Sequence, residues 1–185
     1  MPEARKGWFI EPKAAREIGK SMDVVVLKVD TLRTMWVTGE KKPICWSDDG
    51  VLPSPRVKNP VSTVCEGCEH EKKDLVYRIF CYDVTESAEK GEPVIFTIDC
   101  KGTQLKTVRA FVQAIRSKDK AARDFKVTMQ SQAQENAKGS WFVVQFENIE
   151  RVSSNIKDDV EAAYRQVTGD SGADDFDAGD EVAPF

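Results

Sequence analysis

Four of the five cysteines are spaced in a way that suits a metal site. Cys65 and Cys68 form a CxxC pair in a segment rich in Pro and Gly, with Cys45 upstream and Cys81 downstream. A CxxC pair supplies two thiolates on one tight turn, and two distant ligands can complete the tetrahedron that Zn²⁺ prefers. We therefore predict a Zn²⁺ site that contains Cys45, Cys65 and Cys68, with Cys81 as the favoured fourth ligand.

The identity of the fourth ligand is open at this stage. Cys81 falls in an expected strand and could instead be a core residue, and His70, the single histidine, is the competing ligand. A thioredoxin-like redox role is disfavoured because the CxxC does not lie between a strand and a helix. A zinc hydrolase or deaminase needs an open coordination position, and the chain has no HExxH motif, so we expect no catalytic residues and no enzyme.

A bound metal would also organise the segment that contains these cysteines. Residues 41–74 show little periodicity and are interrupted by several prolines and glycines. A structureless loop of this length is uncommon inside a compact domain. Metal binding can replace a hydrophobic core here, because its free energy becomes folding free energy.

Hydrophobic periodicity predicts the elements that position this loop. Apolar and β-branched composition indicates strands at 24–29, with 34–38 as its partner, and at 75–84 and 93–100, and period-two alternation indicates strands at 125–133 and 141–149. A 3.6-residue pattern indicates helices after Gly102-Thr103 and after Ser154 or Asn155. This order is compatible with a mainly β fold, a five-stranded OB-like barrel with one internal helix. Other small mixed α+β folds have compatible orders.

The predicted organisation has four parts. We expect an N-terminal extension at 1–21 and an OB-like domain at 22–152 that carries the zinc insertion at about 41–81. A C-terminal helix at 153–169 and a disordered acidic tail at 170–185 follow.

Charge is unevenly distributed along the chain. The net charge is −4, but nine acidic residues and one basic residue follow from Asp158 onward, which leaves 26 basic and 22 acidic residues before it. The body is therefore mildly basic and the tail strongly acidic. Such a tail competes with phosphate for a basic surface, and salt weakens that competition.

The strands also carry candidates for binding a single nucleic-acid strand. Sequence-tolerant binding needs aromatic faces for the bases and cations for the phosphates. Alternation places several such side chains on the polar sides of their strands. The candidates are Lys28, Trp36, Arg78, Phe80, Tyr82, Lys126 and Trp141.

Two sets of motifs resemble single-stranded DNA-binding proteins. The chain ends in Asp180-Glu181-Val182-Ala183-Pro184-Phe185, which resembles the acidic C-terminal tip of the bacterial and phage proteins of that family. The order of Cys45-Trp46-Ser47-Asp48-Asp49-Gly50, Asn59-Pro60 and Cys65-Glu66-Gly67-Cys68 is similar to a zinc element of the phage-encoded members, with a resemblance from about Val24 to Ile149.

The resemblance implies a function and a set of partners. It implies sequence-tolerant binding of single-stranded DNA in phage replication or recombination, with structural zinc. It also implies recruitment of replication or repair enzymes through Asp180, Glu181, Pro184 and Phe185. A zinc-ribbon adaptor between proteins is the alternative. We expect a cytoplasmic protein of an infected bacterial host, without a membrane partner, and homo-oligomers are compatible with the sequence.

Overall fold

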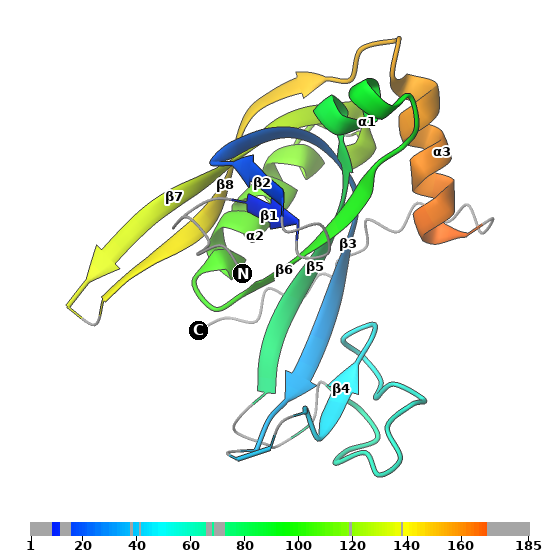
Figure 1. The fold of residues 1–185 in the computed structure, drawn as a ribbon. Coiled ribbons are helices and arrows are strands. Elements are labelled where there is room, and N and C mark those ends of the chain that lie inside the picture. Colours follow the sequence, from blue (N-terminus) through cyan, green and yellow to red (C-terminus); the bar gives the residue numbers. More distant parts are fainter. Residues whose placement is uncertain are drawn as a thin grey trace.

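The computed structural model describes residues 9–11, 16–37, 39–40, 42–65, 68, 73–118, 120–137 and 139–169. They form a mixed fold of helices and strands, with two antiparallel sheets and three α-helices (Figure 1). A two-stranded sheet contains β1 (Phe9–Glu11) and β2 (Arg16–Gly19). The six-stranded sheet contains β3 (Ser21–Met35), β4 (Cys45–Ser47), β5 (Lys73–Asp83), β6 (Ile95–Lys101), β7 (Phe125–Asn136) and β8 (Gly139–Arg151).

The large sheet has the order β6-β5-β3-β7-β8, and β4 pairs with β3 off this path. The sheet is not closed into a barrel, because β6 and β8 form no hydrogen-bonded pair among the described strands. The OB-like barrel that the sequence predicts is therefore not formed by the described strands, which make an open antiparallel sheet. No helix within the described residues is long and apolar enough to cross a membrane.

β3 is one strand of 15 residues that joins the two halves of the sheet. Its first residues pair with β7, whereas Val24 to Met35 pair with β5, with a register shift next to Leu27. The two strands predicted at 24–29 and 34–38 are therefore not hairpin partners. The residues between Val29 and Thr34 include no glycine or proline to reverse the chain, so the strand continues.

One face of the sheet is covered by α2 (Gln104–Arg116), as its apolar periodicity predicts. Val108, Phe111, Val112 and Ile115 are buried in the main core, and the ring of Phe111 stacks on that of Phe146 at 4.4 Å between centroids. Thr103 precedes the helix but makes no side-chain capping hydrogen bond.

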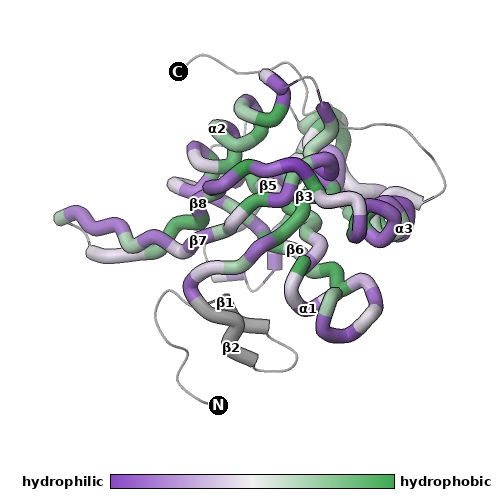
Figure 2. Tube along the Cα trace, turned by 90° about the horizontal axis from the view of Figure 1, so that it is seen from above, coloured by the Kyte–Doolittle hydropathy of each residue, from purple (hydrophilic) through white to green (hydrophobic). Residues whose placement is uncertain are grey.

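The opposite face is covered at one end by α3 (Lys157–Thr168), which confirms the predicted C-terminal helix. Its residues Val160, Ala163 and Tyr164 pack against the face that carries Val25 and Tyr82. Seen from above, α2 and α3 lie on different sides of the central strands (Figure 2).

A short helix, α1 (Val84–Lys90), occupies a segment expected to be a polar connection. Asp83 caps it by accepting a hydrogen bond from the Glu86 N–H at 2.9 Å, and Gly91 ends it in the left-handed conformation. A 3₁₀ turn, Ala122–Asp124, precedes β7.

The ribbon of β3 and β5 extends beyond the helices and carries a separate structure at its end (Figure 1). We call the described residues 36–65 together with Cys68 the small lobe. It contains β4, and its residues Cys45 and Cys68 form a small cluster with Met35 at the end of β3, against which Val57 packs. The lobe corresponds to most of the insertion expected from the sequence.

Candidate metal centre and nucleic-acid face

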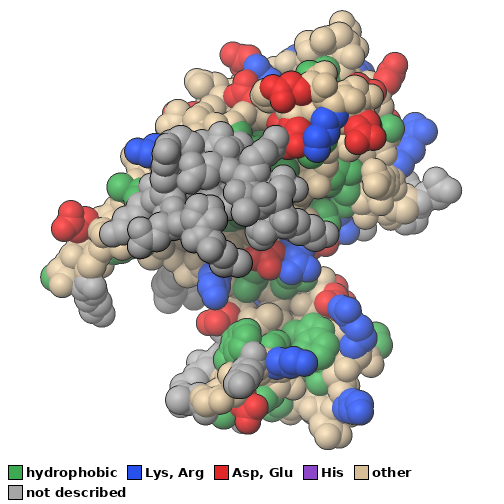
Figure 3. All heavy atoms as spheres, in the orientation of Figure 1, with side chains coloured by type: hydrophobic (Ala, Val, Ile, Leu, Met, Phe, Trp, Pro, Cys, Tyr) green, Lys and Arg blue, Asp and Glu red, His purple; other side chains and the backbone are tan. Residues whose placement is uncertain are grey.

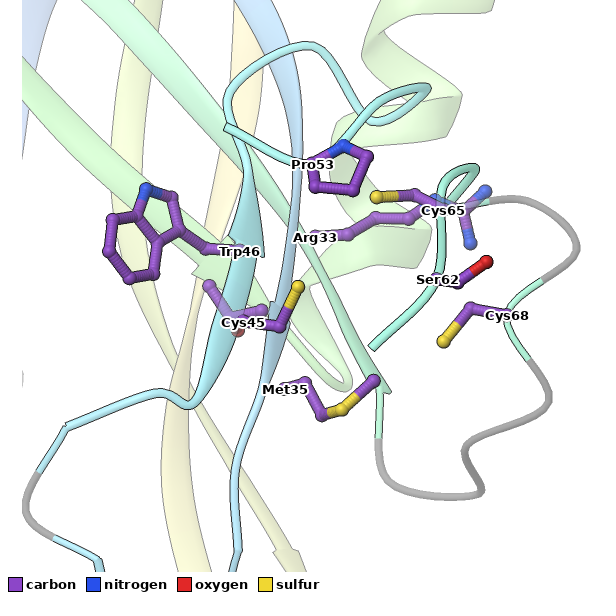
Figure 4. Close-up of a pocket in the computed structure, with 9 residues that line it drawn as sticks. Arg33, Met35, Cys45, Trp46, Pro53, Ser62, Cys65 and Cys68 are labelled. Carbon is purple, nitrogen blue, oxygen red and sulfur yellow. The ribbon is translucent and has the colours of Figure 1, made fainter. Parts of the chain in front are cut away.

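Three of the predicted cysteine ligands line one pocket of the small lobe (Figure 4). Cys45 lies in β4 opposite Met35, and Cys65 and Cys68 come from the end of the following loop. All three are buried and none forms a disulfide. The Cys65 N–H donates to the Val51 carbonyl at 2.8 Å, which ties the cysteine loop to the turn after β4.

That turn is organised by the Asp49 carboxylate. Its Oδ1 accepts hydrogen bonds from the Ser47 hydroxyl at 2.8 Å and from the Val51 and Leu52 N–H groups at 2.7 and 2.9 Å. Burial acts to raise the pKa of Asp49, but the hydrogen bonds from Leu52, Val51 and Ser47 outweigh it and lower the pKa below its ordinary value. The ionised side chain therefore stabilises the turn.

Gly50 brings the same turn against β3. Its φ is +77°, and a Cβ there would lie 3.0 Å from Cγ2 and 3.2 Å from the carbonyl oxygen of Thr31. The Gly50 carbonyl also accepts a hydrogen bond from Nε of Arg33 at 3.0 Å. A glycine is required here both by the backbone conformation and by this close approach.

The three thiols of the pocket are ligands of the kind that binds a soft cation, but they do not form a metal-binding group in the described structure. Three thiols are the ligands that zinc prefers. Burial raises the pKa of the Cys65 thiol, and a hydrogen bond with Ser47 opposes this effect only in part. A nearby cation would therefore be needed to favour the thiolate. Within the described residues no three His, Cys, Asp or Glu side chains form a group that could hold a metal.

Cys81 lies far from this pocket. It pairs with Val26 of β3, whereas Cys45 pairs with Met35. The nine residue steps from Val26 to Met35 span about 30 Å of strand. This geometry does not allow Cys81 to be the fourth ligand, and His70, the alternative, lies outside the described residues.

Core packing accounts for Cys81 instead. The residue is fully buried in the main core together with Cys100. Burial, with a contribution from Cys100, raises the pKa of the Cys81 thiol far above its ordinary value, and burial raises that of Cys100 to about 12. Both thiols are therefore protonated at neutral pH.

Three of the predicted DNA-binding residues lie together on the sheet face opposite α2. Lys28 pairs with Phe80 across β3 and β5, and Arg78 is two residues along. However, Nε and Nη2 of Arg78 bond the Asp99 carboxylate at 2.7 and 2.8 Å, and Nζ of Lys28 lies 2.9 Å from Asp30. The hydrogen bond with Asp99 is also the main cause of the raised pKa of Arg78. Acidic neighbours thus offset the cations that were expected to bind phosphate.

Tyr82 is not available for base stacking. Its side chain is only 2% exposed and belongs to the cluster that α3 covers, and Phe80 is partly buried against the same cluster. Alternation assigned Tyr82 to the correct face of the strand. The prediction of exposure was wrong because a helix about 80 residues later covers that face.

The remaining predicted residues differ in exposure. Nζ of Lys126 lies 3.5 Å from both Asp23 and Glu150, and its pKa is raised chiefly by Asp23. Trp141 is partly buried, and its indole N–H has no hydrogen-bond partner within the described structure. Trp36, just beyond β3, is 39% exposed and is the most accessible of the predicted aromatic side chains.

Sequence reasoning missed an apolar surface on the small lobe. Every large hydrophobic residue that is exposed within the described chain lies between positions 36 and 64: Trp36, Val37, Ile44, Val51, Leu52, Val61 and Val64. Figure 3 shows hydrophobic side chains beside basic ones on this lobe. The available signal was a set of apolar residues in a segment without periodicity.

The predicted partner-binding residues Asp180, Glu181, Pro184 and Phe185 lie outside the described residues. Comparisons of the chain with protein-family models, with curated proteins and with solved structures find no match. The proposals below therefore depend on the residues and geometry of this chain.

Proposed function

We propose that the protein binds single-stranded DNA without catalysing a reaction. The observation that carries this proposal is the order of five strands in the sheet and the place of one helix between them along the chain. Taken as strands one to five, β3, β5, β6, β7 and β8 have the order 3-2-1-4-5, and α2 lies between the third and fourth. This order supports an OB-like interpretation of the sheet, because the OB fold is a five-stranded barrel that is partly open.

Two segments that project from the body of the protein support the same OB-like interpretation. OB folds bind oligonucleotides on the second and third strands and with the loops that join strands 1–2 and 4–5. Here the small lobe lies in the connection between the first two strands, β3 and β5. The last two strands, β7 and β8, are connected directly as a hairpin. The lobe and the hairpin both project from the body of the protein (Figure 1).

We place the bound strand on the part of the β5–β6 face that α3 leaves uncovered, extending toward Trp36 beyond the end of β3. The exposed ring of Trp36 supplies a surface for stacking a base. Lys101 lies on this face, paired with Val76, and is exposed, whereas Arg78 is held by Asp99. We therefore expect base stacking to contribute more to the affinity, and counterion release to contribute less, than in a protein whose binding face carries a row of unpaired cations.

Zinc has a structural role in this proposal. Cys45, Cys65 and Cys68 would hold Zn²⁺, with His70 as the candidate fourth ligand. The metal would fix the small lobe at the end of the β3–β5 ribbon and so orient Trp36, which directly follows Met35 of the lobe cluster. The acidic tip, with Pro184 and Phe185, would recruit replication or recombination enzymes.

The proposal is tested by titrating the full-length protein with oligo-dT while tryptophan fluorescence is followed. Loss of one stacked base costs about 1–3 kcal/mol, so Trp36→Ala should weaken binding about 5- to 150-fold, and Trp36→Phe should retain most of it. Ile44→Ala, which truncates another exposed apolar side chain of the lobe, is the matched control. Absence of oligo-dT binding by the wild-type protein at low salt would overturn the proposal and favour the zinc-ribbon adaptor.

A further inference from the structure

Four exposed aliphatic side chains lie on two neighbouring segments of the small lobe. They belong to Val51, Leu52, Val61 and Val64, and each is between 39% and 55% exposed. The hydrogen bond from the Cys65 N–H to the Val51 carbonyl joins the two segments. We call these four residues the aliphatic patch. The patch does not include Trp36, on which the proposed DNA-binding face depends.

The backbone beneath the aliphatic patch is held by its own hydrogen bonds. The Asp49 carboxylate accepts from the N–H groups of Val51 and Leu52. The Ser62 hydroxyl donates to the Val64 carbonyl at 2.9 Å and accepts from the Val64 N–H at 3.2 Å. The small cluster inside the lobe contains none of the four patch residues. The patch is therefore formed in advance and is not part of the lobe core, as is typical of a surface for a binding partner.

The position of the lobe leaves the aliphatic patch accessible to another large molecule. The lobe lies at the end of the β3–β5 ribbon, beyond the three helices (Figure 1). In the space-filling view a narrow waist separates it from the rest of the molecule (Figure 3). Two copies can therefore bring their lobes together while their bodies stay apart. A two-fold contact, in which the same patch of both copies meets, requires this access.

The charges around the patch favour a second copy of the same chain. Residues 48–65 contain two acids, Asp48 and Asp49, and two bases, Arg56 and Lys58. Arg56 is paired with Asp48 at 3.0 Å, and Asp49 is bonded within its own turn. Two copies of this surface therefore bring no excess of one charge together, whereas an excess would oppose self-association. A strongly acidic or basic partner would find no opposite charge to select it.

We propose that the aliphatic patch binds the same patch of a second copy, which gives a two-fold dimer joined through the small lobes. The inference goes beyond the proposed function and does not require the protein to bind DNA. Four half-exposed side chains make a smaller contact than the roughly 800 Å² per partner of a standard interface. We therefore expect a weak dimer, with a dissociation constant above about 1 μM.

Sedimentation equilibrium of the full-length protein, at concentrations from about 1 μM to 1 mM, tests the proposal. The wild-type protein should pass from monomer to dimer within this range. Leu52→Glu should weaken dimerisation at least about tenfold, because it places two like charges close to the two-fold axis. Ile44→Glu is the matched control. It makes the same change at an exposed apolar residue at the other end of β4, so it should dimerise as the wild type does.

A mixture of Leu52→Glu and Leu52→Lys provides the second arm of the experiment. In a two-fold contact through so small a patch, position 52 of one copy lies near position 52 of the other. Opposite charges then attract in the mixed dimer, so the mixture should dimerise while each variant alone remains largely monomeric. Because restored association requires both variants to fold, this arm separates a lost contact from a misfolded lobe.

Three results would overturn the proposal. They are a wild-type protein that stays monomeric up to about 1 mM, equal dimerisation of Leu52→Glu and Ile44→Glu, and a mixture that fails to dimerise. A monomeric wild type combined with loss of oligo-dT binding in Leu52→Glu would assign the patch to nucleic acid instead.

Discussion

Cys45 and Cys81 occupy opposite ends of one antiparallel ribbon. Cys45 faces Met35 at the end of β3, while Cys81 faces Val26 near its beginning. One metal ion therefore cannot bind both thiols. The cysteines divide into a set that lines the small-lobe pocket and a pair, Cys81 and Cys100, that packs in the main core.

The first prediction concerns metal content. Cys45→Ser, Cys65→Ser and Cys68→Ser should each lower bound zinc per chain, because each removes a thiolate from the pocket. Cys81→Ser should retain the metal but lower the free energy of unfolding by about 1–3 kcal/mol, because it buries a hydroxyl in the core. Metal analysis and denaturant unfolding measure these two effects.

Cys100→Ser is the control for that experiment, since it makes the same change in the same core. Loss of zinc in Cys81→Ser but not in Cys100→Ser would contradict the separation of the two sets.

The second prediction concerns the turn that docks the small lobe on β3. Gly50→Ala should destabilise the lobe, because the new Cβ meets Thr31 at 3.0 Å and the φ of +77° is unfavourable for alanine. We expect a cost of about 1–3 kcal/mol. Gly39→Ala, where φ is +95° but nothing lies near the added Cβ, separates the backbone cost from the steric one. Protease susceptibility of residues 42–65 measures the effect, and equal susceptibility of the two variants would show that contact with Thr31 is unimportant.

The third prediction separates a core aromatic from a surface aromatic. Tyr82→Ala should lower the free energy of unfolding by about 3–5 kcal/mol, as for other large buried rings. Trp36→Ala should change it by less than about 1 kcal/mol, because its ring is 39% exposed. Thermal and denaturant unfolding of the two variants would test this, and comparable losses of stability would mean that Trp36 is a structural residue.

Elements with strong local patterns were predictable from the sequence. Val108, Phe111, Val112 and Ile115 recur at helical spacing, and the structure places all four in the core on α2. The polar segment that forms α1 lacks such a pattern. Its helix depends on the cap at Asp83 and on Gly91, which local hydrophobicity does not reveal.

The candidate site was less predictable because it depends on contacts between distant segments. Alternation assigned Tyr82 to a face, but its burial depends on Val160 and Tyr164 of α3. Cysteine spacing indicated the pair Cys65 and Cys68 together with Cys45, and these three residues share a pocket. Spacing along the chain could not reveal the register that carries Cys81 away from them.

The last prediction is a pH dependence of the small lobe that originates at Asp49. The folded lobe holds the pKa of this carboxylate below the ordinary value of 3.8. A lowered folded-state pKa gives stability that is fully present above the unfolded-state pKa and is lost as the pH falls through the folded-state pKa. We therefore expect the lobe to loosen below about pH 4, seen as lower protection against hydrogen exchange, relative to the intrinsic rate at each pH, at the amides of Val51 and Leu52, which donate to Asp49. Asp49→Asn should raise exchange at neutral pH and flatten its pH dependence, because the amide is never charged. Asp48→Asn removes the same charge one residue earlier without altering those hydrogen bonds, so a pH profile that changes equally in both variants would assign the effect to general charge and not to the Asp49 turn.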